Sequence, residues 1–208
     1  MGTIVYIDGF NFYYGALKET EHKWLDLEKF SQELLRGHQI TAIKFFTAIV
    51  NDRDDDPNQS QRQHIYLRAL GTLPKVTIYK GNFKTRPKTV KLVSRGGKKR
   101  KYVEALVTEE KGTDVSLGAH LVYDACHDSF DAAMVISNDS DLETPLQMAV
   151  DMGKKVIVVN PHRHHDQPDH LFGNERRNIQ SRHLRNSQFP KIIEDSKGRK
   201  IHKPQEWL

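Results

Sequence analysis

Short apolar runs alternate with amphipathic segments along most of the chain, and this alternation restricts the fold more than any other sequence feature. The apolar runs are short enough to be strands buried on both faces of a sheet, and they cover residues 3–7, 42–50, 75–81, 132–137 and 155–159. Amphipathic helices are predicted between them at residues 26–35, 58–70, 112–126 and 140–152. The pattern predicts an α/β domain with a mostly parallel central sheet.

The 208 residues fit one domain with an insertion, and we expect residues 1–160 to form that domain. Residues 161–208 are polar and basic with no clear period, which predicts an extension that packs on the domain or trails from it. Within this extension we expect a short helix near residues 174–185 and a final edge strand at residues 189–195.

A strongly basic stretch interrupts the alternation ahead of the helix at 112–126. Between Lys84 and Lys101 the sequence has nine basic residues and no acidic one. "TVKLVS" and "KYVEALVT" alternate apolar and polar residues around "RGGKK", which predicts an inserted β-ribbon at about residues 83–108. Isolated basic runs are commonly solvated hairpins. A basic ribbon can also lie along a phosphate backbone, and the substrate-binding candidates are then the residues at its tip: Lys98, Lys99, Arg100 and Lys101.

Composition narrows the class of protein. The formal net charge is +5, and no segment approaches the roughly 20 apolar residues that a membrane span needs. The N-terminal residues lack the parts of a secretory signal, so a cytoplasmic location is predicted. The single cysteine, Cys126, excludes an internal disulfide and is predicted to pack as a small apolar residue. The histidines of "HRHHDQPDH" match no closed zinc site and lie in a predicted loop.

Acidic side chains follow the predicted strands at the points where the strands end. Asp8 directly follows the run 3–7, Asp139 and Asp141 follow the run 132–137, and Asp114 lies at the start of the helix after the ribbon. Ligands of an open parallel sheet bind beyond the carboxyl ends of its strands, so we expect these acids at one rim. Taken singly, Asp114 or Asp139 is more typical of a helix cap. Gathered together, carboxylates repel one another unless they bind a cation or share a proton.

Oxygen ligands of this kind suit Mg²⁺ or Mn²⁺, and an ion held with open positions can promote phosphodiester hydrolysis. We therefore expect Asp8, Asp114 and Asp139 to hold the ion directly or through water. Asp141 is expected to be a further ligand or to support one of the ligands.

Polar residues beside these acids complete the candidate site. Asn11, one helical turn beyond Asp8, can orient a ligand or bond a carboxylate. Ser137 and Asn138 can present a hydroxyl and an amide to a phosphate. Lys111 can neutralise the scissile phosphate, although it can equally pair with Glu109 or Glu110.

Three blocks of this sequence resemble the NYN domain, in the LabA-like branch of the PIN-like ribonuclease superfamily. The blocks are "IVYIDGFNFYYG", "EEKGTDVSLGAHLVYDA" and "DAAMVISNDSDLETPLQMAVDMGKKVIVV". The first resembles that family's strand-end aspartate and asparagine, the second its K-G-x-D block and the third its S-x-D-S-D block. The resemblance implies a Rossmann-like, PIN-like three-layer sandwich, a site for Mg²⁺ or Mn²⁺, and RNA as the substrate. We expect the RNA to be single-stranded and its cleavage to be endonucleolytic. The basic insertion departs from the pattern and is interpreted as a substrate grip.

Other functions remain open at this point. A protein of this fold can be a non-catalytic RNA-binding or scaffold protein, and the aromatic residues of "GFNFYY" can stack on single-stranded bases. A haloacid-dehalogenase-like phosphatase would need an acid where Phe10 stands, and a dinucleotide-binding oxidoreductase would need a G-x-G-x-x-G turn after the first strand. PIN-like relatives often assemble, so a homodimer is a further expectation.

Overall fold

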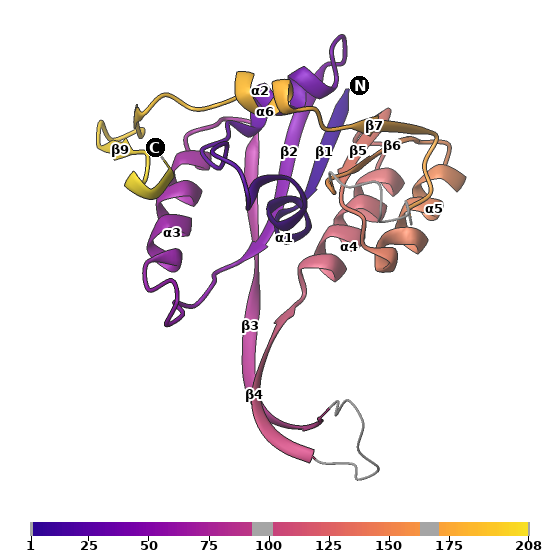
Figure 1. Cartoon of the computed structure of the whole chain (residues 1–208). Coiled ribbons are helices and arrows are strands. Elements are labelled where there is room, and N and C mark those ends of the chain that lie inside the picture. The colour runs from indigo at the N-terminus through magenta and orange to yellow at the C-terminus, as the bar shows by residue number, and fades with distance from the viewer. Residues whose placement is uncertain (1, 93–101, 163–170, 208) are drawn as a thin grey trace.

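A seven-stranded sheet forms the centre of the protein in the computed structural model, which describes residues 2–92, 102–162 and 171–207. Figure 1 shows the strands side by side with α3 on one side and α4 and α5 on the other, and one long ribbon leaves the body of the molecule. The strands of the sheet are β1 (Thr3–Asp8), β2 (Ile40–Ala48), β3 (Val76–Lys91), β4 (Tyr102–Lys111), β5 (Ala132–Ile136), β6 (Lys155–Asn160) and β7 (Glu175–Asn178).

The strand order β4-β3-β2-β1-β5-β6-β7 makes β1 the centre of the sheet. All neighbouring strands run parallel except β3 and β4, which are antiparallel. From β1 the chain moves outward through β2 and β3, and it then returns to the other side of β1 to form β5 and β6. The prediction of a mostly parallel α/β sheet is therefore confirmed, and strand order reverses between β1 and β5.

Helices cover both faces of the sheet, and the side chains of β1 alternate between two hydrophobic cores. Val5 and Ile7 pack into one core, whereas Ile4 and Tyr6 pack into the other. The helical segments are α1 (Gly9–Phe12), η1 (Tyr13–Leu17, a π-helix), α2 (Leu27–Leu34), α3 (Gln59–Leu70), α4 (Thr113–Cys126), η2 (Ser140–Leu142), α5 (Glu143–Asp151), α6 (Ser181–Asn186) and η3 (Gln205–Trp207). No helix in the described part of the chain has the length and apolar character that crossing a bilayer demands.

The basic ribbon is an extension of the sheet edge. The first part of β3 pairs with β2 as far as Gly81, and from Asn82 onward the same strand pairs with β4. Figure 1 shows the two strands leaving the sheet together and bending away from the helices. The ribbon thus begins one residue before the predicted boundary, and its predicted substrate-binding tip, residues 98–101, lies outside the described residues.

Two predictions are wrong, one for the residues after β6 and one for Cys126. Residues 175–178 form the parallel edge strand β7, and the helix expected near 174–185 is restricted to Ser181–Asn186. Cys126, expected to pack as a small apolar residue, is exposed at the end of α4. The expected last strand does form at β8 (Ile192–Glu194), where it pairs with β9 (Lys200–His202) rather than with the central sheet.

A buried polar cluster ties α4 to the sheet. Lys44 of β2 forms an ion pair with Asp124 of α4, and the Tyr6 hydroxyl of β1 donates a hydrogen bond to the same carboxylate at 2.5 Å. Asp124 is 6% exposed. Burial, followed by the hydrogen bond to Asp124, raises the pKa of Tyr6, which keeps the phenol protonated. Because α4 carries Asp114, this cluster also positions one of the candidate acids.

Replacing Asp124 by alanine is expected to lower the free energy of unfolding by about 3–5 kcal/mol, because Lys44 then keeps a buried charge without its partner. Urea denaturation measures the change, with Asp151→Ala at the exposed end of α5 as the control. The double variant Lys44→Met/Asp124→Leu should recover most of the loss. A loss below about 1 kcal/mol for Asp124→Ala would contradict this assignment.

Candidate functional site

Three of the predicted acids line one pocket at the carboxyl ends of the central strands. The pocket has a volume of about 520 Å³, and we call it the acidic pocket. Its predicted members are Asp8, Asn11, Asp114 and Asp139. It lies beyond the carboxyl ends of β1 and β5, between which the strand order reverses, and ligands of open α/β sheets bind at such a point.

Asp8 is the most buried acid of the pocket, with 4% of its surface exposed. Its Oδ1 accepts a hydrogen bond from the Asn11 backbone N–H at 3.0 Å, and its Oδ2 accepts one from the Ser137 hydroxyl at 2.9 Å. Burial raises the pKa of Asp8; the two donors oppose that rise, and the charge of Asp139 adds to it. The carboxylate is therefore held in place at an energetic cost, which is typical of functional rather than purely structural acids.

The segment after β5 forms a relay of hydrogen bonds toward Asp8. The Asp139 backbone N–H donates to the Ser137 hydroxyl oxygen at 3.1 Å, and this hydroxyl in turn donates to Asp8. The Asn138 backbone N–H donates to the side-chain oxygen of Asn11 at 3.1 Å. Ser137 and Asn138 are both buried, so in this structure they bind the candidate acids and the loop rather than open solvent.

Glycine at position 9 allows the chain to turn immediately after Asp8. A β-carbon at Gly9 would lie 2.6 Å from the Phe46 carbonyl oxygen and 2.9 Å from the Phe45 ring. The start of α1 therefore packs directly on the end of β2, and no larger residue fits there. This close packing fixes Asn11 one turn beyond Asp8, where its backbone and side chain reach the two strand ends.

Asp114 reaches the pocket from the first turn of α4. The residue that precedes the helix is Gly112, which has a φ of 98° and contributes no side-chain cap. Asp114 is thus not the capping residue, in contrast to Asp139, whose Oδ1 accepts the Asp141 backbone N–H at 2.9 Å. Of these two residues only Asp139 is a helix cap, and it also lines the pocket. Asp8 is a cap as well, because its Oδ1 accepts the Asn11 backbone N–H at the start of α1.

The acidic pocket fits a hard divalent cation held by few protein ligands. Within the described ranges, no three carboxylate, imidazole or thiolate groups are close enough together to enclose one ion. Mg²⁺ commonly uses one or two carboxylates and fills its remaining positions with water and substrate phosphate. Asp8 and Asp139, whose charges interact, and Asp114 in the same pocket are oxygen donors of that kind.

Two other predicted site residues lie away from the pocket lining. Asp141 is exposed, and its backbone rather than its carboxylate contacts Asp139. Lys111 forms an ion pair with Glu109 at 3.1 Å, which is the alternative pairing considered for it. Lys111 and then Lys88 lower the pKa of Glu109 to about 2, and Arg86 lies 3.3 Å from the same carboxylate. Glu109 thus offsets part of the ribbon's positive charge.

Several pocket residues were not singled out from the sequence. Asp52 lies in the loop after β2, at the same edge of the sheet as the other acids, and the strand-end rule points to this loop as well. Thr113 precedes Asp114 and is buried. Phe83, at the base of the ribbon, meets Phe10 of α1 edge-to-face with ring centroids 5.6 Å apart. The ribbon therefore starts at the rim of the acidic pocket.

Comparison with known proteins places the fold and the family. Residues 2–180 match the NYN domain. The 6-hydroxy-3-succinoylpyridine 3-monooxygenase HspA of Pseudomonas putida (strain DSM 28022 / S16) is 30% identical over 237 aligned residues, covering 99% of this chain and 75% of that protein. The crystal structure of a protein of unknown function from Vibrio parahaemolyticus RIMD 2210633 has a TM-score of 0.51 and 19% identity, covering 86% of this chain and 94% of that one. The match over most of the chain shows that this protein belongs to the NYN domain family.

Proposed function

We propose that this protein is a ribonuclease of the LabA-like branch that hydrolyses phosphodiester bonds of single-stranded RNA with Mg²⁺ or Mn²⁺, by endonucleolytic cleavage. The observation that carries the proposal is the convergence of Asp8, Asp114 and Asp139 on one pocket at the switch point of the sheet. The NYN domain, a member of the PIN-like nuclease superfamily, supports the same reaction class.

The residues of the pocket have separate tasks in this proposal. Asp8, Asp114 and Asp139 would hold the ion directly or through water, and the ion would supply charge stabilisation for phosphoryl transfer when bound. Ser137 orients the Asp8 carboxylate by a hydrogen bond to Oδ2. Asn11 fixes the loop after β5 through the Asn138 backbone. These bonds hold the acids in one geometry before substrate arrives, and such pre-organisation favours catalysis.

The basic ribbon would bind the RNA backbone beside the pocket. Its base meets α1 at the rim of the acidic pocket, and Lys84 and Lys91 are among the basic residues of β3. The tip residues Lys98, Lys99, Arg100 and Lys101 are proposed to add phosphate contacts. Phosphate contacts of this kind position RNA without reading its sequence.

Neutral replacements of the three acids are expected to abolish cleavage while RNA binding persists. Asp8→Asn, Asp114→Asn and Asp139→Asn should each reduce the rate by at least about 100-fold, because each removes one of the charges that hold the ion directly or through water. The measurement is cleavage of labelled single-stranded RNA with Mn²⁺, Mg²⁺ or EDTA, with RNA affinity determined on the same preparations.

Asp151→Asn is the matched control, since it makes the same chemical change at an exposed site at the end of α5. It should cleave as the unmodified protein does. Cleavage that survives in Asp8→Asn and Asp139→Asn would indicate a contaminant or another site and would remove the nuclease proposal. Salt-sensitive RNA binding without cleavage by the unmodified protein would instead favour a non-catalytic RNA-binding protein.

The burial of Asp8 predicts that the acid costs stability in the absence of the ion. Its folded pKa is raised, so the folded state holds the proton more tightly than the unfolded chain does. The pKa of an aspartate in the unfolded chain is about 4. As pH rises from that value through the raised pKa of folded Asp8, the free energy of unfolding therefore falls. In EDTA near neutral pH, Asp8→Asn should unfold at a higher temperature than the unmodified protein, and the difference should shrink toward about pH 4.

Thermal unfolding followed by circular dichroism measures this difference. Added Mn²⁺ should stabilise the unmodified protein and have a smaller effect on Asp8→Asn, because only a state that binds the ion gains stability from it. An unfolding temperature for Asp8→Asn that is equal or lower near neutral pH would show that the hydrogen bonds to the carboxylate outweigh the cost of its burial.

A second candidate function is hydroxylation of an aromatic heterocycle. The Pseudomonas relative, which aligns with nearly the whole chain, is named as a monooxygenase of a succinoylpyridine. The specific observation in its favour is an aromatic-walled cavity that adjoins the acidic pocket and shares Phe10 and Tyr14 with it. Such a reaction transfers one atom of O₂ to the ring and reduces the other to water with two electrons from an added reductant, for which NADH serves in the assay.

An oxygen electrode distinguishes this candidate from the nuclease. If the second function applies, 6-hydroxy-3-succinoylpyridine should cause oxygen uptake and an equal consumption of NADH. The expected result under the nuclease proposal is no uptake above the rate without substrate. Uptake coupled to formation of a hydroxylated product would make the oxygenase the better assignment.

A further inference from the structure

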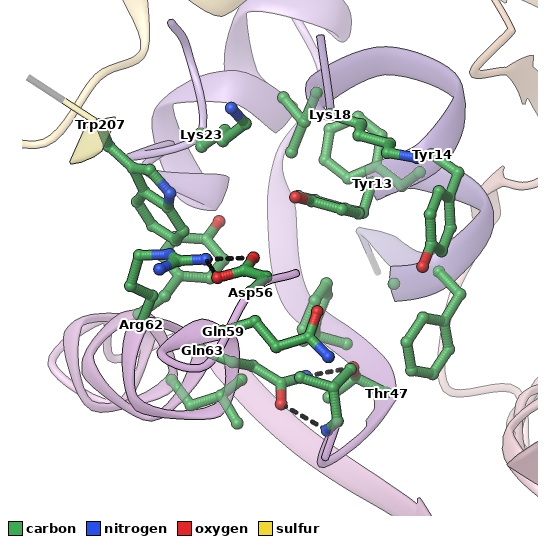
Figure 2. A pocket seen from close by; sticks show the side chains of 18 of the residues that line it. Tyr13, Tyr14, Lys18, Lys23, Thr47, Asp56, Gln59, Arg62, Gln63 and Trp207 are labelled. Carbon is green, nitrogen blue, oxygen red and sulfur yellow. Dashed lines mark hydrogen bonds and ion pairs between the residues drawn. The ribbon is translucent and has the colours of Figure 1, made fainter. Parts of the chain in front are cut away.

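An aromatic cavity of about 290 Å³ lies on the other side of α1 from the centre of the acidic pocket. It is enclosed by the α1–η1 segment, the end of β2, the following loop, α3 and the last described residues of the chain. Rings contribute much of its wall: Phe10, Phe12, Tyr13, Tyr14, Tyr66 and Trp207. Figure 2 shows these elements around a central space, with Trp207 closing one side.

The backbone of η1 is unusual where it lines this cavity. Residues 13–17 form a π-helix, in which the Lys18 N–H bonds to the Tyr13 carbonyl at 2.8 Å across five residues. Single π-helical turns are rare and occur frequently at functional sites. Here the wide turn directs consecutive residues, Tyr13 and Tyr14, to the same cavity. Their rings meet edge-to-face with centroids 5.3 Å apart.

A polar group without a partner points into the cavity. The Tyr13 hydroxyl is directed toward the central space in Figure 2, and it has no hydrogen-bond partner among the described residues. Tyr13 is half-buried, and burial raises its pKa, so the phenol stays protonated and can donate. Across the space lies Gln59, whose side-chain N–H donates to the Asn51 carbonyl and leaves its amide oxygen as an acceptor.

The cavity lining is basic. It contains four cationic side chains, Lys18, Lys23, Arg53 and Arg62, and one acidic side chain, Asp56. Asp56 is already bound by Arg62, which also contacts Glu206. The Lys18 ammonium lies 5.1 Å from the Tyr14 ring centroid. Neither Lys18 nor Lys23 has an ion pair with a carboxylate in the described part of the chain, so their charges are available to a ligand.

A packing defect or a pool of water explains these features less well. A water molecule occupies about 30 Å³ of liquid, so this volume would hold several waters. Seven of the nineteen lining residues are aromatic, and their ring faces favour a flat ring that stacks on them over water. Among the polar residues that also line the cavity, the partnerless hydroxyl and the two ammonium groups can orient such a ligand.

We propose that this cavity binds a planar aromatic heterocycle that carries an anionic group. The ring would lie between the aromatic walls formed by Tyr13 and Trp207, and the Tyr13 hydroxyl would donate to a ring heteroatom or carbonyl. Lys18 and Lys23 would hold the anionic group near the mouth. Two kinds of ligand have this chemistry, a nucleotide of an RNA chain and a free heterocyclic carboxylate. The binding of either ligand can be measured without any catalytic reaction.

Isothermal titration calorimetry in EDTA tests the site separately from any reaction. The probes are AMP and UMP for the nucleotide source, and 6-hydroxynicotinate for the free carboxylate. Tyr13→Phe should weaken the binding of the active probe by about threefold to tenfold, the effect of one hydrogen bond. Lys23→Gln should weaken it to a similar or greater extent, because hydrogen bonds to charged groups are stronger.

Matched controls make the same changes away from the cavity. Tyr123→Phe alters an exposed tyrosine of α4, and Lys197→Gln removes an exposed charge between β8 and β9. Both should bind the probe as the unmodified protein does. Circular dichroism of Tyr13→Phe confirms that the variant is folded before its affinity is compared.

The outcomes of the titrations distinguish the two kinds of ligand from each other, and they also test whether the cavity is a binding site. Binding of AMP or UMP that depends on Tyr13 identifies a base-binding site for the RNA substrate. Binding of 6-hydroxynicotinate alone, with the same dependence, identifies a small-molecule site. Binding of no probe, or equal affinity in Tyr13→Phe and the unmodified protein, overturns the proposal. A failed cleavage assay would leave each of these results unchanged, so failure of the nuclease proposal is recognised independently.

Discussion

A carboxylate buried at the end of β1 is the constraint around which the acidic pocket is built. Burial disfavours the charge of Asp8, so the charged form depends on donors placed at its two oxygens. The two donors come from segments that are far apart in the sequence. One is the backbone N–H of Asn11 in α1, and the other is the Ser137 hydroxyl beyond β5. Parallel pairing of β1 with β5 brings the two strand ends level. The contacts that satisfy the buried charge are therefore the same contacts that join the first and last blocks of the family pattern.

Local pattern was sufficient to predict the centre of the fold, because the central strands are apolar on both faces and their helices have one apolar side. It failed where structure depends on distant pairing. Glu175–Asn178 is a polar segment without strand periodicity, and it is extended because β6 offers it an open edge. Cys126 occupies the last position of α4, where the rotation of the helix on the sheet decides which side chains are exposed. Neither the open edge nor that rotation is encoded by nearby residues.

The sequence predicts the members of the candidate site correctly where the end of a strand determines the position of the side chain. Asp8 is the last residue of β1 and Asp139 lies three residues after β5, so the geometry of a parallel sheet brings them to one edge. Asp141 follows the same strand, but the tight turn of η2 directs its backbone to Asp139 and leaves its side chain exposed. The aromatic cavity could not be predicted from sequence. Trp207 reaches it only because the chain's last described residues pack on α3, where Glu206 contacts Arg62.

The acidic pocket and the aromatic cavity share a wall and have opposite charge. Phe10, Tyr14 and Arg53 line both spaces, with acids on one side and lysines on the other. Without a cation, the acids repel an anionic ligand that extends from the cavity toward them. A bound cation offsets much of that repulsion, and the cation itself attracts the anionic group of the ligand across the shared wall. Linkage makes this effect reciprocal, so each raises the affinity for the other. Opposed charges on the two sides of one aromatic wall thus favour a ligand that has both a ring and an anionic group, and they favour it most when the acidic pocket is filled.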